Sequence, residues 1–245
     1  MPVALGIVVA LKEELAAVEA ARAALPEDLR ARVRAVRGGV GGAAAAKAAR
    51  QLFIEAKPAL LASSGFSGGL VEDLPRGAVV LGAEIRACRD AASASDAAGV
   101  ACDPAALARA QDALTKAGLS FRAGILVTVA EPVFKAAEKR ALGQAAAALA
   151  VDMEAAAVAR FASEVQLPFL ALRAISDTAQ EDLPEEVGGF LSESGDVKVG
   201  NVAKFVLRDP RRLGALMRLK AGSDEAAKGL SSAWGALLPA LIADL

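Results

Sequence analysis

Two stretches of sequence decide the fold: VDMEAAAVAR at Val151–Arg160 and RAISDTA at Arg173–Ala179. In each of them, acidic residues stand at the end of a short apolar run of strand length. The alanines that follow Glu154 are good helix formers. In open α/β sheets, ligands bind outside the carboxyl ends of the strands. The two stretches therefore predict two buried strands of an α/β enzyme that present Asp152, Glu154 and Asp177 to a ligand.

The rest of the chain alternates between strand-like and helix-like segments as far as about residue 180. Apolar or alternating runs indicate the strands, and segments rich in helix formers lie between them. The other expected strands are Val3–Ala10, Arg32–Val36, Ala59–Ser63, Ala78–Ile85 and Phe121–Val129. The expected helices are Leu11–Ala24, Ala43–Ile54, Pro104–Ala117 and Pro132–Leu142, followed by a helical tail over about 201–245 with an interruption at Pro210. The alternation predicts one α/β domain over residues 1–245, with helices on both faces of the sheet.

Other segments carry no functional expectation. The small and polar segment Asp90–Val100 is predicted to be a surface loop. The helix that carries Lys135, Lys139 and Arg140 is predicted to present a solvated charged face. Trp234, the one tryptophan, lies on the last amphipathic segment and is expected to be a packing or interface residue.

The composition narrows the chemistry, because the 245 residues include no histidine and no tyrosine. This excludes Ser-His-Asp and Cys-His triads, histidine-ligated zinc and histidine acid–base catalysis. Proton transfer must therefore use carboxylates, lysine, cysteine or water. We expect neither a metal site nor a cofactor.

The net charge and the two cysteines bear on the cellular compartment and on binding to nucleic acid or membranes. A net charge of −1 creates no bulk field that would attract nucleic acid or an anionic membrane, so neither partner is expected. The N-terminus lacks a basic region before its apolar run, and no run approaches the ~20 apolar residues that span a bilayer. The two cysteines do not indicate a disulfide framework. We therefore expect a cytoplasmic protein that does not insert into membranes.

Two glycine-rich stretches follow expected strands. GVGGAA at Gly39–Ala44 fits the dinucleotide pattern G-x-G-x-x-A, but it follows the second strand and no acidic residue ends a strand about 20 residues later. A glycine turn that packs a helix on the sheet is the favoured interpretation, and an NAD-dependent oxidoreductase is the alternative. In SGFSGGL at Ser64–Leu70, glycine would let backbone N–H groups approach a ligand closely.

With these motifs in this order, the chain resembles the nucleoside phosphorylase superfamily. It is most similar there to the 5'-methylthioadenosine/S-adenosylhomocysteine nucleosidases and to the hopanoid-associated nucleosidase/phosphorylase group. The resemblance spans residues 6–179 and rests on Gly6–Leu15, Gly39–Ala49, Ser64–Leu70 and the two deciding stretches. It implies a nucleoside phosphorylase-like three-layer fold with a mixed twisted sheet flanked by helices. It also implies a purine nucleoside substrate, no cofactor and a homodimer or a larger assembly.

The resemblance assigns roles to matching residues. Glu14 matches the acid that activates the attacking water, and Asp177 matches the acid that binds and protonates the purine at N7. Ser176 and Arg173 would hold Asp177 in place. Glu154 matches the acid that grips the ribose hydroxyls. These roles suit the reaction, because breaking an N-glycosidic bond develops positive charge on the ribose and negative charge on the base, and general acid–base help is worth about 10²–10⁴-fold.

The resemblance also implies further substrate-binding residues: Met153 packed on the sugar, Gly68 and Ser67 at the sugar site, Asp152 where many relatives have glutamate, and Phe66. Phe66 departs from the family, whose members usually carry a small hydroxyl residue at that position. Its ring would fill part of the pocket or shape it for a bulky apolar 5'-substituent.

Water is the expected nucleophile. Phosphorolytic relatives hold phosphate with an arginine just before the third-strand glycine loop, and this chain has Ser63 there. Phosphate needs cationic or N–H partners. The expected function is therefore hydrolysis of the N-ribosidic bond of a 5'-substituted adenosine. The alternatives are a phosphate-dependent purine nucleoside phosphorylase, a hopanoid-pathway enzyme acting on an adenosyl-lipid, and a binding protein that keeps the fold without turnover.

Overall fold

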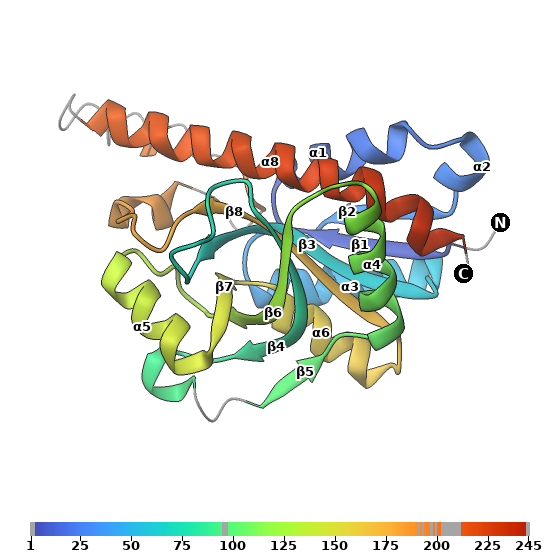
Figure 1. Ribbon diagram of the computed structural model, residues 1–245, viewed down its shortest axis with the longest axis horizontal. Coiled ribbons are helices and arrows are strands. Elements are labelled where there is room, and N and C mark those ends of the chain that lie inside the picture. The colour runs from blue at the N-terminus through green and yellow to red at the C-terminus, as the bar shows by residue number, and fades with distance from the viewer. Residues whose placement is uncertain are drawn as a thin grey trace.

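A computed structural model describes residues 3–94, 98–190, 192, 194–196, 198, 200–201 and 212–243. Within these residues, eight strands form one mixed sheet (Figure 1). The strands are β1 Leu5–Val9, β2 Val33–Arg37, β3 Leu60–Gly69, β4 Val79–Ala87, β5 Gly99–Ala101, β6 Phe121–Thr128, β7 Ala148–Asp152 and β8 Phe169–Asp177. The mixed sheet and both strands that end in an acid, β7 and β8, agree with the expectation from the sequence.

The sheet is partly closed into a ring, which the sequence did not predict. β3 pairs with β8, β8 with β4, β4 with β6, β6 with β7, and β7 returns to β3. β1 and β2 extend the sheet outward from β3, and β5 extends it from β4. Each of the five ring strands therefore has a partner on both sides.

Helices cover both faces of the sheet and complete three layers (Figure 1). Helices α1, α4 and α8 share one hydrophobic cluster with the sheet, and α3 and α6 share another. The helices are α1 Lys12–Ala23, α2 Glu27–Arg30, α3 Gly42–Ala56, α4 Pro104–Lys116, α5 Ala136–Ala146, α6 Ala155–Glu164 and α8 Leu213–Ile242, with short 3₁₀ turns η1 Ala91–Ser93 and η2 Glu185–Gly189. Among the described residues, no helix combines the length and the apolar character needed to cross a bilayer.

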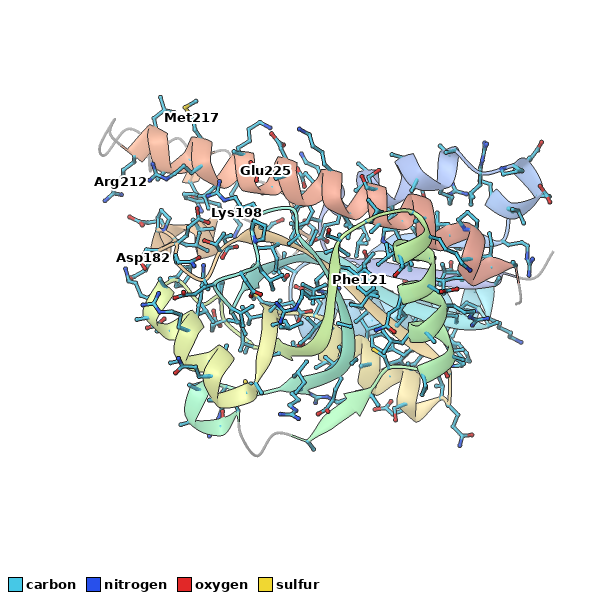
Figure 2. The ribbon with its side chains drawn as sticks, in the orientation of Figure 1. Phe121, Asp182, Lys198, Arg212, Met217 and Glu225 are labelled. Atoms are coloured by element: carbon cyan, nitrogen blue, oxygen red, sulfur yellow. The ribbon has the colours of Figure 1, made fainter. Side chains whose placement is uncertain are left out.

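The long helix α8 lies along one face of the sheet (Figure 1). Trp234 on this helix is fully buried and donates a hydrogen bond from Nε1 to Ser64 Oγ at 2.8 Å, which makes it a packing residue. At the other end of α8, Met217 is 66% exposed and points away from the sheet (Figure 2). The expected interruption at Pro210 and the basic residue Arg211 lie outside the described residues.

Several boundaries differ from the expectation. β3 does not end at Ser63 but continues through the glycine-rich stretch to Gly69, because β8 and β7 pair with that stretch on its two sides. The segment expected to be a loop contains η1 and the short edge strand β5. Helix α5 begins at Ala136, whose N–H donates to Asp182 Oδ1 at 2.8 Å, and not at Pro132.

Candidate active site

A cavity of about 180 Å³ opens where β3, β7 and β8 end beside the N-terminal turns of α1 and α3. Nine of the ten site residues expected from the sequence line it: Glu14, Phe66, Ser67, Gly68, Asp152, Met153, Glu154, Ser176 and Asp177. The tenth, Arg173, does not line it. Residues far apart in the sequence thus meet around one concave space, as the residues of a small-molecule site do.

The register of β3 brings the two deciding stretches together. Gly68 of β3 pairs with Val151 of β7 on one side and with Asp177 of β8 on the other. β7 and β8 run in opposite directions, yet both end beside this one residue. A Cβ on Gly68 would lie 3.1 Å from Asp177 Oδ2, so glycine leaves room for the carboxylate.

Glu14 is buried at the first turn of α1, where three backbone N–H groups hold its carboxylate. Its Oε2 accepts from the N–H groups of Ala10 at 2.8 Å and Leu11 at 2.9 Å, and its Oε1 accepts from Phe66 N at 2.8 Å. Burial raises the pKa of Glu14 above its usual 4.5, and these hydrogen bonds oppose the rise. A buried carboxylate held in one orientation at the edge of the cavity suits a general base.

Glu154 lies between the start of α3 and the start of α6. Its Oε1 accepts from Gly41 N at 2.7 Å. Gly41 has φ of 91°, a left-handed conformation that favours glycine. Burial, followed by the neighbouring carboxylate of Asp152, raises the pKa of Glu154 to about 7. The side chain does not cap α6, which leaves it available to a ligand in the cavity.

Asp152 is an anchoring residue of the cavity wall. Its Oδ2 accepts from Arg173 Nε at 2.7 Å and Nη2 at 2.6 Å. Its Oδ1 accepts from Thr128 Oγ1 at 2.6 Å and from Ala155 N at 3.2 Å, in the first turn of α6. Both oxygens are therefore engaged by protein groups, and Asp152 fixes the position of the neighbouring Glu154.

The expectation that Arg173 holds Asp177 was wrong. Besides its ion pair with Asp152, Arg173 donates from Nη2 to Ser63 Oγ at 2.8 Å, and its side chain is 2% exposed. Arg173 precedes Asp177 by four residues on one strand, which separates their backbones by about 13 Å. The expected contact of Ser176 is confirmed, because its Oγ donates to Asp177 Oδ1 at 2.7 Å.

The second partner of Asp177 is Lys139, and the expectation that this lysine lies on a solvated helix face is wrong. Its Nζ lies 2.5 Å from Asp177 Oδ2, and the residue is fully buried. A signal was present in the sequence, because Lys139 shares a helical stripe with Ala136, Gly143 and Ala146 at spacings of three and four residues. A charged residue on an apolar stripe indicates a buried charge with a partner.

Apolar groups complete the cavity. Met153 and the partly buried Phe66 contribute side chains to the wall, together with Val40 and Leu183. The hydroxyl of Ser67 is buried and has no hydrogen-bond partner among the described residues. The apolar wall suits the flat faces of a ligand and an apolar substituent.

The charge of the lining restricts the ligand. Within the described residues the lining carries four carboxylates, those of Glu14, Asp152, Glu154 and Asp177, and no lysine or arginine side chain. No group of three or more Cys, Asp and Glu side chains in this part of the chain is placed to hold a metal ion. Among the described residues, the lining therefore offers carboxyl groups to positive charge that develops on a neutral polar ligand, and it offers a free anion such as phosphate no cationic side chain.

Proteins of similar sequence are named as nucleosidases. The 5'-methylthioadenosine/S-adenosylhomocysteine nucleosidase of Aeromonas salmonicida is 27% identical over 181 residues, which cover 69% of this chain and 79% of the relative. That of Shewanella pealeana is 26% identical over 173 residues, which cover 65% of this chain and 74% of the relative.

Solved structures share the fold. The Helicobacter pylori 5'-methylthioadenosine/S-adenosylhomocysteine nucleosidase superimposes with a TM-score of 0.73 at 16% identity and covers 100% of both chains. A Helicobacter pylori futalosine hydrolase mutant superimposes with a TM-score of 0.71 at 16% identity and covers 99% of this chain and 100% of its own. The family model described as Phosphorylase superfamily matches residues 5–208 of this chain. Since this match extends over most of the sequence and the fold agrees, the protein belongs to the phosphorylase superfamily.

Proposed function

We propose that this protein is a nucleosidase that uses water to cleave the N-ribosidic bond of a 5'-substituted adenosine. The observation that carries the proposal is the cavity lining, which, among the described residues, combines a buried Glu14, a carboxyl group at Asp177 and no cationic side chain. The names of the sequence relatives support the choice of substrate class.

Asp177 acts on the leaving base. Its carboxyl group donates a proton to purine N7 while the bond between ribose C1' and base N9 breaks, and both electrons of that bond go to the base. Adenine then leaves as a neutral molecule. Ser176 fixes the orientation of Asp177 through its hydrogen bond to Oδ1.

Glu14 acts on the nucleophile. The carboxylate takes a proton from water as the water oxygen attacks C1', and the three backbone N–H groups keep the carboxylate in place. A positioned base of this kind contributes about 10²–10⁴-fold to the rate.

The sugar lies between these two groups. Glu154 accepts hydrogen bonds from the ribose hydroxyls, and Met153 packs against the ring. The sugar acquires positive charge as the bond breaks, and preorganised carboxylates nearby stabilise that charge. Beside the sugar, the apolar side chains of Leu11, Val40 and Phe66 favour an apolar 5'-substituent such as a methylthio group.

A base-release assay tests the proposal. Purified protein is incubated with 5'-methylthioadenosine, S-adenosylhomocysteine, adenosine, inosine or a 5'-alkyl adenosine, each with and without phosphate, and free base is measured by chromatography. We expect adenine from the thioethers without phosphate. A strict requirement for phosphate, with a ribose 1-phosphate product, would show that the nucleophile is wrong, and turnover of the alkyl compound alone would reassign the substrate.

Two variants assign the catalytic residues. Asp177→Ala and Glu14→Gln are each expected to lower turnover by about 10²–10⁴-fold while the fold persists. Glu13→Gln is the matched control, because its side chain on the same turn of α1 is 42% exposed. Full turnover in either of the first two variants would remove that residue from the mechanism.

We also propose that the protein is a cytoplasmic homodimer without a nucleic-acid partner. Cys88 and Cys102 are both free thiols, in line with a reducing compartment. The net charge of −1 supports the absence of nucleic acid. The exposed Leu213 and Met217, one turn apart on α8, are suited to a subunit contact. Light scattering after gel filtration measures the assembly, and a monomeric mass would contradict the dimer.

A further inference from the structure

Lys139 is an ammonium group buried behind the cavity. Its Nζ donates to Asp177 Oδ2 at 2.5 Å, to Glu181 O at 3.0 Å and to Thr178 O at 3.2 Å. An ammonium group has three N–H donors, so these three acceptors satisfy it completely. The residue is fully buried and is absent from the cavity lining, which means that it touches the acid and not the space for the ligand.

The buried ammonium charge of Lys139 is not explained by packing alone. A buried ion is costly unless it is paired and hydrogen-bonded, and an apolar residue of similar volume often stabilises a fold equally well. Lys139 could therefore be replaced by an apolar residue without loss of packing, but Asp177 would lose its cationic partner. On the same helix, Arg140 also ties the loop after β8, through Nη1 to Ala179 O at 3.3 Å, without contacting the acid.

We propose that Lys139 is a positioning residue that acts through Asp177 in the departure of the base. This inference rests on the proposed nucleosidase function. In the reaction, the proton moves from the Asp177 carboxyl group to purine N7, and the C1'–N9 electron pair goes to the base. Asp177 becomes a carboxylate, whose new charge forms beside the ammonium of Lys139. Lys139 keeps its three protons, and Asp177 regains a proton from water after the base has left.

The pair has two effects on that step. The ammonium stabilises the carboxylate that the proton transfer creates, so the transfer to N7 becomes more favourable as the bond breaks. It also prevents rotation of the side chain, because Lys139 occupies Oδ2 while Ser176 occupies Oδ1. Both effects should therefore accelerate the reaction only when the leaving base must be protonated.

The test compares two leaving groups in one enzyme. Lys139→Met keeps the length of the side chain and removes the charge, and Lys139→Gln removes the charge but keeps N–H donors for the loop carbonyls. Arg140→Met is the matched control on the same helix. The substrates are 5'-methylthioadenosine and a 4-nitrophenyl 5-methylthioriboside, whose nitrophenolate departs without protonation.

We expect kcat for 5'-methylthioadenosine to fall about 10²-fold in both Lys139 variants, with KM changed by less than about threefold. Turnover of the nitrophenyl substrate should change by less than about threefold, and Arg140→Met should be nearly neutral for both substrates. Circular dichroism and thermal unfolding confirm that the variants are folded.

Other outcomes would overturn the inference. An equal loss with both substrates would mean that Lys139 only supports the shape of the site. Unchanged adenine release in a folded Lys139→Gln protein would mean that the ammonium has no part in catalysis. A wild-type protein that releases no adenine would instead refute the proposed function itself.

Discussion

The substitution Glu154→Gln should stabilise the ligand-free protein while it removes activity. The pKa of Glu154 is about 7 in the folded protein, against a usual value of 4.5. Between these two pH values the folded state binds more protons than the unfolded chain. The free energy of unfolding therefore falls as the pH rises through this range, because the folded protein must then hold a partly buried carboxylate that the unfolded chain ionises in water. Glutamine is never charged, so the variant should lack this loss.

The size of the effect follows from the pKa. One pKa unit corresponds to about 1.4 kcal/mol, so the displacement of Glu154 corresponds to at most about 3 kcal/mol. The neighbouring carboxylate of Asp152 shares in this pKa displacement, and the side chain of Glu154 is only partly buried. We therefore expect the free energy of unfolding to change by about 1–2 kcal/mol. For a chain of this size that equals about 2–8 °C in Tm. The hydrogen bond from Gly41 N survives, because the glutamine Oε1 accepts it equally well.

Thermal and urea unfolding of the ligand-free proteins measures the effect at about pH 5.5 and about pH 8. The wild type should lose stability between the two pH values, and Glu154→Gln should lose about 1–2 kcal/mol less. Glu164→Gln is the control, because Glu164 lies at the other end of the same helix with its side chain 66% exposed. If Glu154→Gln and the wild type show the same pH dependence, the reasoning from burial is wrong.

Gly65→Ala should lower turnover at least about tenfold, because its Cβ would lie 2.8 Å from Glu14 Oε1 and displace the base; unchanged kinetics of adenine release would contradict this. Arg173→Met should cost about 3–5 kcal/mol, since it leaves Asp152 as a buried charge without its ion pair; urea unfolding measures the loss, and a value below about 1 kcal/mol would show that the pair is unimportant. Trp234→Phe should cost about 1–3 kcal/mol through the lost hydrogen bond and the smaller ring; an unchanged Tm would show that the indole N–H contributes nothing.

The sequence predicted the site more completely than it predicted the topology. Apolar runs that end in an acid identified β7 and β8, because fully buried strands produce a local pattern that needs no knowledge of their neighbours. The closure of the five-strand ring depends on pairings between segments as distant as β3 and β8. No local pattern records such a pairing, so the sequence alone does not predict the ring.

The contacts of Asp177 also show that the sequence predicts neighbours along the chain better than contacts between distant elements. Ser176 is its neighbour in sequence, and its predicted contact is confirmed. Lys139 reaches Asp177 from another element across 38 residues. The family resemblance implies that Arg173 holds Asp177, but the extended backbone between the two residues places them too far apart.

The glycines of SGFSGGL have a use that the sequence does not reveal. Their expected role, to let backbone groups approach a ligand, stays a prediction. In the structure, Gly65 leaves room for the carboxylate of Glu14, and Gly68 leaves room for that of Asp177. Glycine marks a close approach in both interpretations, and only the structure identifies the group that approaches.

Helix α8 sets the order in which the protein can mature on the ribosome. At Gly222 it packs so closely on β8 that a Cβ would lie 2.1 Å from Ser176 O, next to Asp177. Gly222 is made 45 residues after Asp177, which at about 5–20 residues per second is a delay of about 2–9 seconds. During that interval the nascent sheet exposes the apolar face that α8 later covers. A nascent chain arrested before α8 should therefore recruit chaperones and lack turnover, although it already carries Glu14, Glu154 and Asp177.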